Sequence, residues 1–110
     1  MRRFALFIVL AVVACRAKSG APACEAVAGQ FFLLASGELD KATVDPATQR
    51  AVADQLPAMR DALKDACKDG AWSPEVRTCM ALARDHAAMQ ICEQKLTDDQ
   101  RAALDKPAAH

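Results

Sequence analysis

Apolar residues recur every three or four positions through most of the chain after residue 22, a spacing that places them on one face of a helix. Cys24, Val27, Phe31 and Leu34 form the first such series, which we expect to end near Gly37. No stretch alternates with the two-residue period of a strand. The pattern therefore predicts an all-α fold, a small bundle of about four to five short helices.

The second apolar series has the strongest boundary signals. Asp45 followed by Pro46 is typical of a helix start, with an N-cap side chain and proline at the first helical position. The series then runs up to Gly70. Pro57 lies inside it and lacks a backbone N–H, so we expect a kink or two abutting helices there, with Leu56 displaced from helical geometry.

Three further helix starts follow Gly70. Ser73-Pro74 repeats the cap-and-proline pattern, and Asp85 is a candidate cap for the next segment. Thr97-Asp98-Asp99-Gln100 matches a capping box, in which the Thr and Gln side chains each bind the other's backbone N–H. These signals predict three short helices before the end of the chain.

The beginning of the chain has the organisation of an export signal. A short basic segment, Met1–Arg3, precedes the apolar stretch Phe4–Ala14, which is shorter than the ~20 residues needed to span a bilayer. Val12-Val13-Ala14-Cys15 then resembles the lipobox of bacterial lipoproteins. The resemblance implies cleavage before Cys15 and lipid on its thiol. Ordinary secretion with cleavage after Ala17 is the alternative.

The lipobox resemblance sets the expected domain organisation. Residues 1–14 would be the signal peptide, 15–22 the lipidated cysteine and a polar tether, 23–106 the helical domain and 107–110 a tail. Two acyl chains on Cys15 would give stable membrane anchoring. Arg16, where some lipoproteins have Asp, points by the same resemblance to the outer membrane of the bacterial envelope rather than the inner one.

The cysteine count supports this organisation. Of five cysteines, lipidation of Cys15 leaves an even four, Cys24, Cys67, Cys79 and Cys92, each on the apolar face of its predicted helix. In an oxidising compartment we expect two disulfides. Because Cys67 and Cys79 flank a short link, we favour a nested pattern, Cys67–Cys79 with Cys24–Cys92. Sequential pairing, Cys24–Cys67 with Cys79–Cys92, is the second choice.

A recognisable set of residues extends from Leu63 to the end of the chain: Cys67, Asp69, Trp72-Ser73, Cys79, Ala83, Cys92, Leu96-Thr97, Gln100 and Leu104. In these residues the C-terminal part of the chain resembles small, uncharacterised four-cysteine helical lipoproteins common in myxobacteria. These are helix caps, core positions and cysteines, so the resemblance implies a location and an architecture but no activity.

Composition and charge narrow the range of partners. Hydrophobic residues make up 53% of the chain, which argues against disorder. Basic and acidic side chains number 14 each, and removal of Arg2 and Arg3 with the signal peptide leaves an acidic excess of two. Nucleic-acid binding requires a basic face, so we do not expect a nucleic-acid partner.

The residues with reactive or metal-binding side chains form no catalytic or zinc motif. The cysteines and histidines lack the close pairs of zinc sites, and no C-x-x-C, G-x-S-x-G or H-E-x-x-H occurs. The candidate hydrolase residues are Ser36, Ser73, His86 and His110, but Ser73 is better placed as a helix cap. Thioethers of Met59, Met80 and Met89 could bind Cu(I), although methionine at helical spacing usually fills a core. We expect no catalytic residues, metal or cofactor.

Three aromatic residues are candidates for partner binding. Phe31 and Phe32 extend the apolar surface of the first helix beyond one face, and Trp72 lies in a predicted interhelical turn. Each also has a structural interpretation, as core residues or as a hydrophobic staple. We therefore expect a lipid-anchored, non-catalytic envelope protein that acts as an interaction or accessory module, with an envelope protein as a possible partner. A small-molecule or metal carrier with a pocket near Trp72 and the methionines is one alternative, and a structural envelope factor is another.

Overall fold

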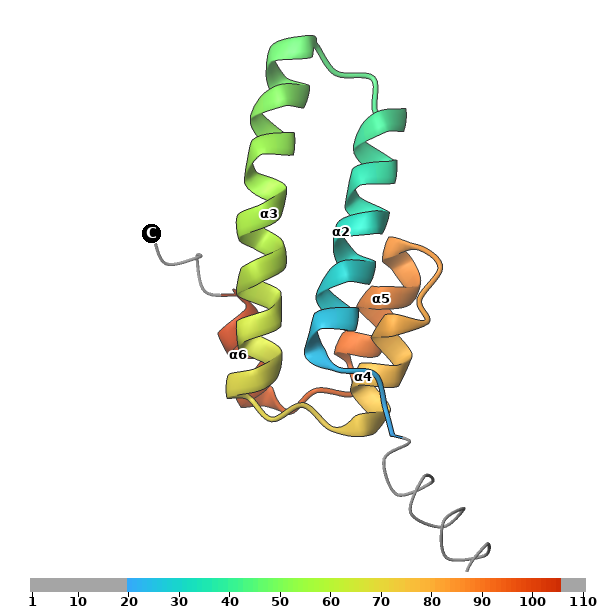
Figure 1. Ribbon diagram of the computed structural model, residues 1–110, viewed down its shortest axis with the longest axis vertical. Helices are drawn as coiled ribbons and strands as arrows, with labels where there is room; N and C mark the ends of the chain where they lie inside the picture. The colour runs from blue at the N-terminus through green and yellow to red at the C-terminus, as the bar shows by residue number, and fades with distance from the viewer. Residues whose placement is uncertain (1–19, 106–110) are drawn as a thin grey trace, which may run out of the picture.

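The computed structural model describes residues 20–105, and within that range the chain is all-α (Figure 1). The helices are α2 Cys24–Lys41, α3 Pro46–Asp69, α4 Pro74–Ala81, α5 His86–Glu93 and α6 Asp98–Asp105. The predicted fold class, a small helical bundle with two disulfides, is confirmed. The predicted signal peptide 1–14, the lipidation site Cys15, most of the tether 15–22 and the tail 107–110 lie outside the described residues.

Helices α2 and α3 form a long antiparallel hairpin (Figure 1). Contrary to expectation, α2 does not end near Gly37 but continues to Lys41. Glycine ends a helix by adopting positive φ, and no glycine in residues 20–105 does so. The extra turn contacts α3, where the Gln49 side-chain amide donates to the Leu39 carbonyl at 3.4 Å.

Helix α3 begins as predicted but is not interrupted at Pro57. The Asp45 carboxylate accepts a hydrogen bond from the Thr48 N–H at 3.1 Å, and Pro46 follows it. Beyond Pro57 the helix continues to Asp69, so the expectation of two abutting helices is wrong, and Leu56 remains helical. Proline removes one helical hydrogen bond, but Leu56 is only 5% exposed, and its burial favours an unbroken helix.

The turn between α3 and α4 closes through a Schellman motif. The Trp72 N–H donates to the Cys67 carbonyl at 3.1 Å, and the Ala71 N–H donates to the Lys68 carbonyl at 3.2 Å. Ala71 adopts φ 47°, the left-handed region that glycine usually occupies in this motif. Gly70 precedes it instead, where an added Cβ would lie 2.9 Å from the Ala66 carbonyl oxygen and 3.1 Å from the Trp72 ring.

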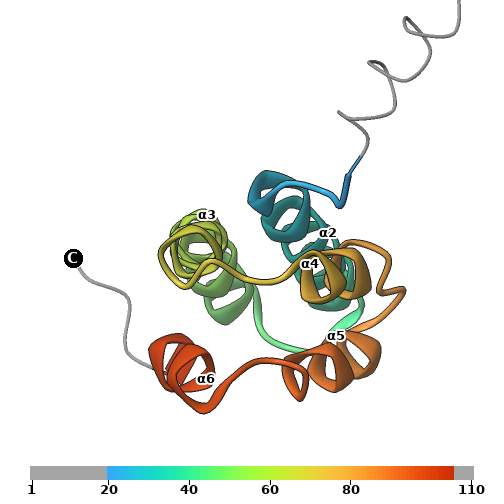
Figure 2. The same ribbon diagram turned by 90° about the horizontal axis from the view of Figure 1, so that it is seen from below.

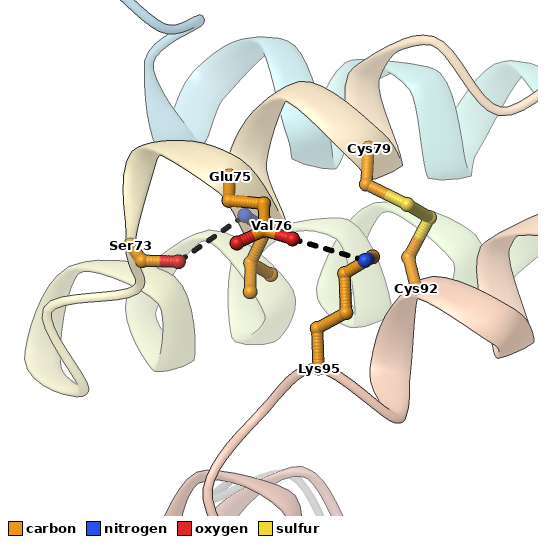
Figure 3. Close-up of polar contacts among 6 residues, drawn as sticks. All are labelled: Ser73, Glu75, Val76, Cys79, Cys92 and Lys95. Atoms are coloured by element: carbon orange, nitrogen blue, oxygen red, sulfur yellow. Dashed lines mark hydrogen bonds and ion pairs between the residues drawn. A yellow bond between two sulfur atoms is a disulfide. The ribbon is translucent and has the colours of Figure 1, made fainter.

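The starts of the three short helices are as predicted. Ser73 Oγ accepts from the Val76 N–H at 3.2 Å (Figure 3), and the Asp85 carboxylate accepts from the Ala88 N–H at 2.7 Å. Thr97 and Gln100 form the complete capping box, with reciprocal hydrogen bonds of 2.9 and 3.2 Å.

The buried core lies at one end of the hairpin. We call this end the base, residues 20–34 and 59–105, and the projecting part of the hairpin the distal arm, residues 35–58. Seen from below, α5 and α6 lie on the same side of the α2–α3 hairpin (Figure 2). The main cluster of buried residues belongs to the base: Cys24, Val27, Cys67, Trp72, Val76, Met80, Ala83, Met89, Cys92 and Leu96.

The disulfides are sequential, so the favoured nested pairing is wrong. Cys24 bonds Cys67 and Cys79 bonds Cys92, with a Cα–Cα distance of 5.7 Å in each pair. The nested prediction assumed that α4 lies beside α3, whereas α4 packs against α2 and α5. Cys24 at the start of α2 instead lies opposite Cys67 in the last turn of α3, as the antiparallel hairpin requires.

Candidate functional site

A pocket of about 340 Å³ lies inside the base, where all five described helices contribute to its wall. Most of its lining is apolar, and three lining side chains can carry charge: His86, Glu93 and Asp105. The apolar lining residues are Phe31, Met59, Ala62, Leu63, Ala66, Met80, Met89, Ala103 and Leu104. The volume falls at the lower end of the ~300–1,000 Å³ typical of small-molecule sites.

Helical spacing and small side chains build this pocket. On α3, Met59, Leu63 and Ala66 recur at intervals of three and four residues and so share one face. On α5, Met89 lies between His86 and Glu93 on one face in the same way. Alanine on α3 and α6 leaves space that a larger side chain would fill, and this space becomes the pocket.

Every methionine in the described residues lines the pocket. Met80 on α4 and Met89 on α5 are 1% and 4% exposed, whereas Met59 on α3 is 43% exposed. The first two therefore form an inner wall and Met59 lies at the opening. Methionine is unbranched and polarisable, so a wall of this kind can adapt to ligands of different shape.

The charge of the lining is one-sided. Glu93, which is half-buried, and Asp105, which is exposed, belong to the lining, and no lysine or arginine among residues 20–105 does. Within the described part of the chain Glu93 forms no ion pair. These carboxylates were not predicted as site residues, because the sequence shows acidic residues on all polar faces. The heptad-like spacing of His86, Met89 and Glu93 was the available signal.

The structure places the three predicted aromatic site residues in three different environments. Phe31 is partly buried and lines the pocket. Phe32 is also partly buried, with the Arg60 guanidinium carbon 5.1 Å from its ring centroid, a cation–π arrangement. Trp72 is 3% exposed and belongs to the core, so it has no free surface for a partner, and it does not line the pocket. This burial agrees with the structural interpretation of Trp72 as a packed side chain.

Polar contacts fix the base around the pocket. The Arg77 guanidinium donates to the carbonyls of Trp72 at 3.2 Å and Pro22 at 3.0 Å, which ties the segment before α2 to the α3–α4 turn. The Gln30 side-chain amide donates to the Ala83 carbonyl at 2.6 Å, and that of Gln100 to the Gly70 carbonyl at 2.8 Å. These bonds position α2, α4 and α6 relative to one another.

Two ion pairs lie beside the disulfides. Lys68 Nζ is 2.6 Å from Glu25 Oε2, one residue beyond the Cys24–Cys67 bond on each helix. The hydrogen bond from Lys68 lowers the pKa of Glu25, and the same contact raises the pKa of Lys68. Lys95 Nζ is 3.0 Å from Glu75 Oε1, near Cys79–Cys92 (Figure 3). Both pairs are exposed; the first links α2 to α3, and the second links α4 to the segment that follows α5.

The candidate catalytic and metal-binding side chains either have structural roles or lie apart from one another. Ser73 uses its hydroxyl as a helix cap, and all four cysteines in residues 20–105 are in disulfides. In the same range no three His, Cys, Asp or Glu side chains gather closely enough to hold a metal ion. The apolar pocket with its acidic lining residues is therefore the candidate site in the base.

Comparisons with models of protein families, with curated proteins and with solved structures found no match. Among residues 20–105, no helix combines the length and hydrophobicity needed to cross a membrane.

Proposed function

We propose that the chain is an exported, lipid-anchored envelope protein that acts without catalysis as an interaction or accessory module. Its location rests on the resemblance of the segment ending at Cys15 to a lipobox. The two disulfides support export, because such bonds persist in oxidising compartments. The eight-residue tether, residues 15–22, reaches at most about 30 Å when extended, so the base would stay close to the membrane.

The observation that carries the interaction role is the distal arm. The chain enters α2 at the base, so the arm would extend away from the anchored end (Figure 1). Its only buried residue is Leu56, and Val44 and Val52 are 43% and 38% exposed. Larger apolar side chains are exposed on the base, Leu33, Leu82 and Ile91, so the support for the arm is its projection and its sparse burial rather than an apolar patch.

Photocrosslinking in intact cells tests this proposal. A photoreactive residue at Val52 in the arm should capture one envelope protein repeatedly, and a Cys15→Ala variant, released from the membrane, should lose that product. The matched control is the same photoreactive residue at Ile91 in the base, which is 62% exposed. Equal, unselective labelling from both positions would contradict an interaction role for the arm.

The pocket favours a second candidate function, a small-molecule carrier. Its volume of about 340 Å³ far exceeds what a bare metal ion needs, since ligand atoms lie only ~2–2.5 Å from a bound metal. We therefore propose that a carrier role would involve an organic molecule. Native mass spectrometry of the protein extracted from its own membrane would detect a retained molecule, and Ala62→Phe, at an exposed position of the pocket wall, should remove it.

A further inference from the structure

We propose that the pocket in the base binds a small organic cation, a protonated amine or quaternary ammonium group attached to an apolar body. This inference rests on the carrier role proposed above and specifies the chemical class of its ligand.

The charge of the lining selects a cation over an anion. Glu93 and Asp105 belong to its lining, and the described residues contribute no lysine or arginine to it. A ligand with a carboxylate or phosphate would bring like charges together, most unfavourably beside the half-buried Glu93. A positive group gains Coulomb attraction from the same two side chains. The imidazole of His86 is the remaining polar side chain of the lining.

The apolar walls define the rest of the ligand. Met80 and Met89 present thioether chains that are almost entirely buried, and the Phe31 ring lies in the same lining. Aromatic faces attract cations and thioethers adapt to apolar groups. A volume of about 340 Å³ suits one ring or a short alkyl chain near the positive group, rather than a peptide or a complete lipid.

Three probes that share one ring and differ in charge test the inference: benzylamine, benzyl alcohol and benzoate. Binding to the full-length lipid-anchored protein in nanodiscs would be measured by ligand-observed NMR, with empty nanodiscs as the blank. Benzylamine should bind at least about five-fold more tightly than benzyl alcohol. This factor is expected from the Coulomb attraction between two unit charges ~4 Å apart in water, without screening by salt. Benzoate should bind most weakly.

Charge-neutralising variants locate the effect. Glu93→Gln and Asp105→Asn should each weaken benzylamine binding several-fold and leave benzyl alcohol unchanged. Glu38→Gln is the matched control, because Glu38 is an exposed carboxylate of the distal arm that does not line the pocket. Ala62→Phe should weaken all three probes by occupying the pocket, and thermal unfolding would show that each variant is folded.

The possible outcomes separate this inference from the carrier proposal. Equal binding of benzylamine and benzyl alcohol, lost in Ala62→Phe, would overturn the cation inference and leave a carrier of neutral molecules. Probe binding that Ala62→Phe does not change, or no binding of any probe, would overturn both. Silver(I) binding that displaces every probe and disappears in Met59→Leu and Met89→Leu would replace the organic cation with a soft metal ion.

Discussion

The base and the distal arm are built from the same two long helices, yet they are held together very differently. The base contains both disulfides and the buried core residues, with side chains such as Arg77 and Gln100 bonded to carbonyls of distant segments. The arm has one buried residue, Leu56. Its one hydrogen bond from a side chain to a carbonyl of another segment runs from Gln49 to Leu39 at 3.4 Å. The stabilising contacts are therefore concentrated near the proposed anchor and the pocket. We expect local unfolding of the arm to cost less free energy than unfolding of the base.

Removal of the disulfides should have the largest effect on the base. Loop-closure entropy predicts that opening Cys24–Cys67, with a separation of 43 residues, costs about 4 kcal/mol of unfolding free energy. Opening Cys79–Cys92, with a separation of 13, costs about 3 kcal/mol. Urea unfolding of the two double Cys→Ala variants would measure both losses. Losses below about 1 kcal/mol would show that the base does not depend on its disulfides.

Truncation of one apolar side chain in each region sharpens the comparison. Met80 in the base is 1% exposed, so Met80→Ala should lower the unfolding free energy by about 2–5 kcal/mol. Val52 in the arm is 38% exposed, and Val52→Ala should change it by about 0.5 kcal/mol or less. Chemical denaturation measures both, and similar losses would mean that the arm is packed as tightly as the base.

A pair of opposite substitutions tests the turn that leads into the base. Ala71 has φ 47°, so Ala71→Gly should stabilise the protein by about 1 kcal/mol. Gly70→Ala would place a Cβ 2.9 Å from the Ala66 carbonyl oxygen and should destabilise it by about 1–3 kcal/mol. Differential scanning calorimetry should therefore show melting temperatures that move in opposite directions. Shifts of the same sign would contradict the described turn.

The smallest expected effect is a pH dependence that both regions share. The Lys68 contact lowers the pKa of Glu25 in the base, and Thr48 lowers the pKa of Asp45 in the arm. A carboxyl group whose pKa is lowered by folding stabilises the folded state at pH values above the ordinary pKa of the group. This stabilisation is lost as the pH falls through the pKa of the group in the folded state. Lys68, whose pKa is raised, loses its contribution only at high pH. Glu25→Gln should flatten the acid side of a melting-temperature profile, whereas Glu38→Gln should leave it unchanged.

Local chemistry made much of this fold predictable from the sequence. Asp45, Ser73, Asp85 and Thr97 cap helices as expected, because a cap depends on residues only three positions away. The errors arose where distant segments decide the outcome. The continuous helix through Pro57 depends on the burial of Leu56, a tertiary effect that the proline pattern does not contain.

The site was less predictable than the fold for the same reason. The disulfide pairing followed from the packing of α4 on α2, which the short link before Ser73 does not specify. Trp72 was placed in a turn correctly, but its burial comes from residues far along the chain. The methionines were recognised as a group, whereas the pocket depends on alanines such as Ala62 and on the carboxylates of Glu93 and Asp105.

The central claim, a lipid-anchored protein with a disulfide-stapled base, is tested most directly by the intact mass of the detergent-extracted protein, alkylated before and after reduction. We expect a chain that starts at Cys15, carries acyl mass and takes up four alkyl groups only after reduction, and peptide mapping should join Cys24 to Cys67 and Cys79 to Cys92. A chain without acyl mass whose cysteines react before reduction would contradict both the anchor and the stapled base.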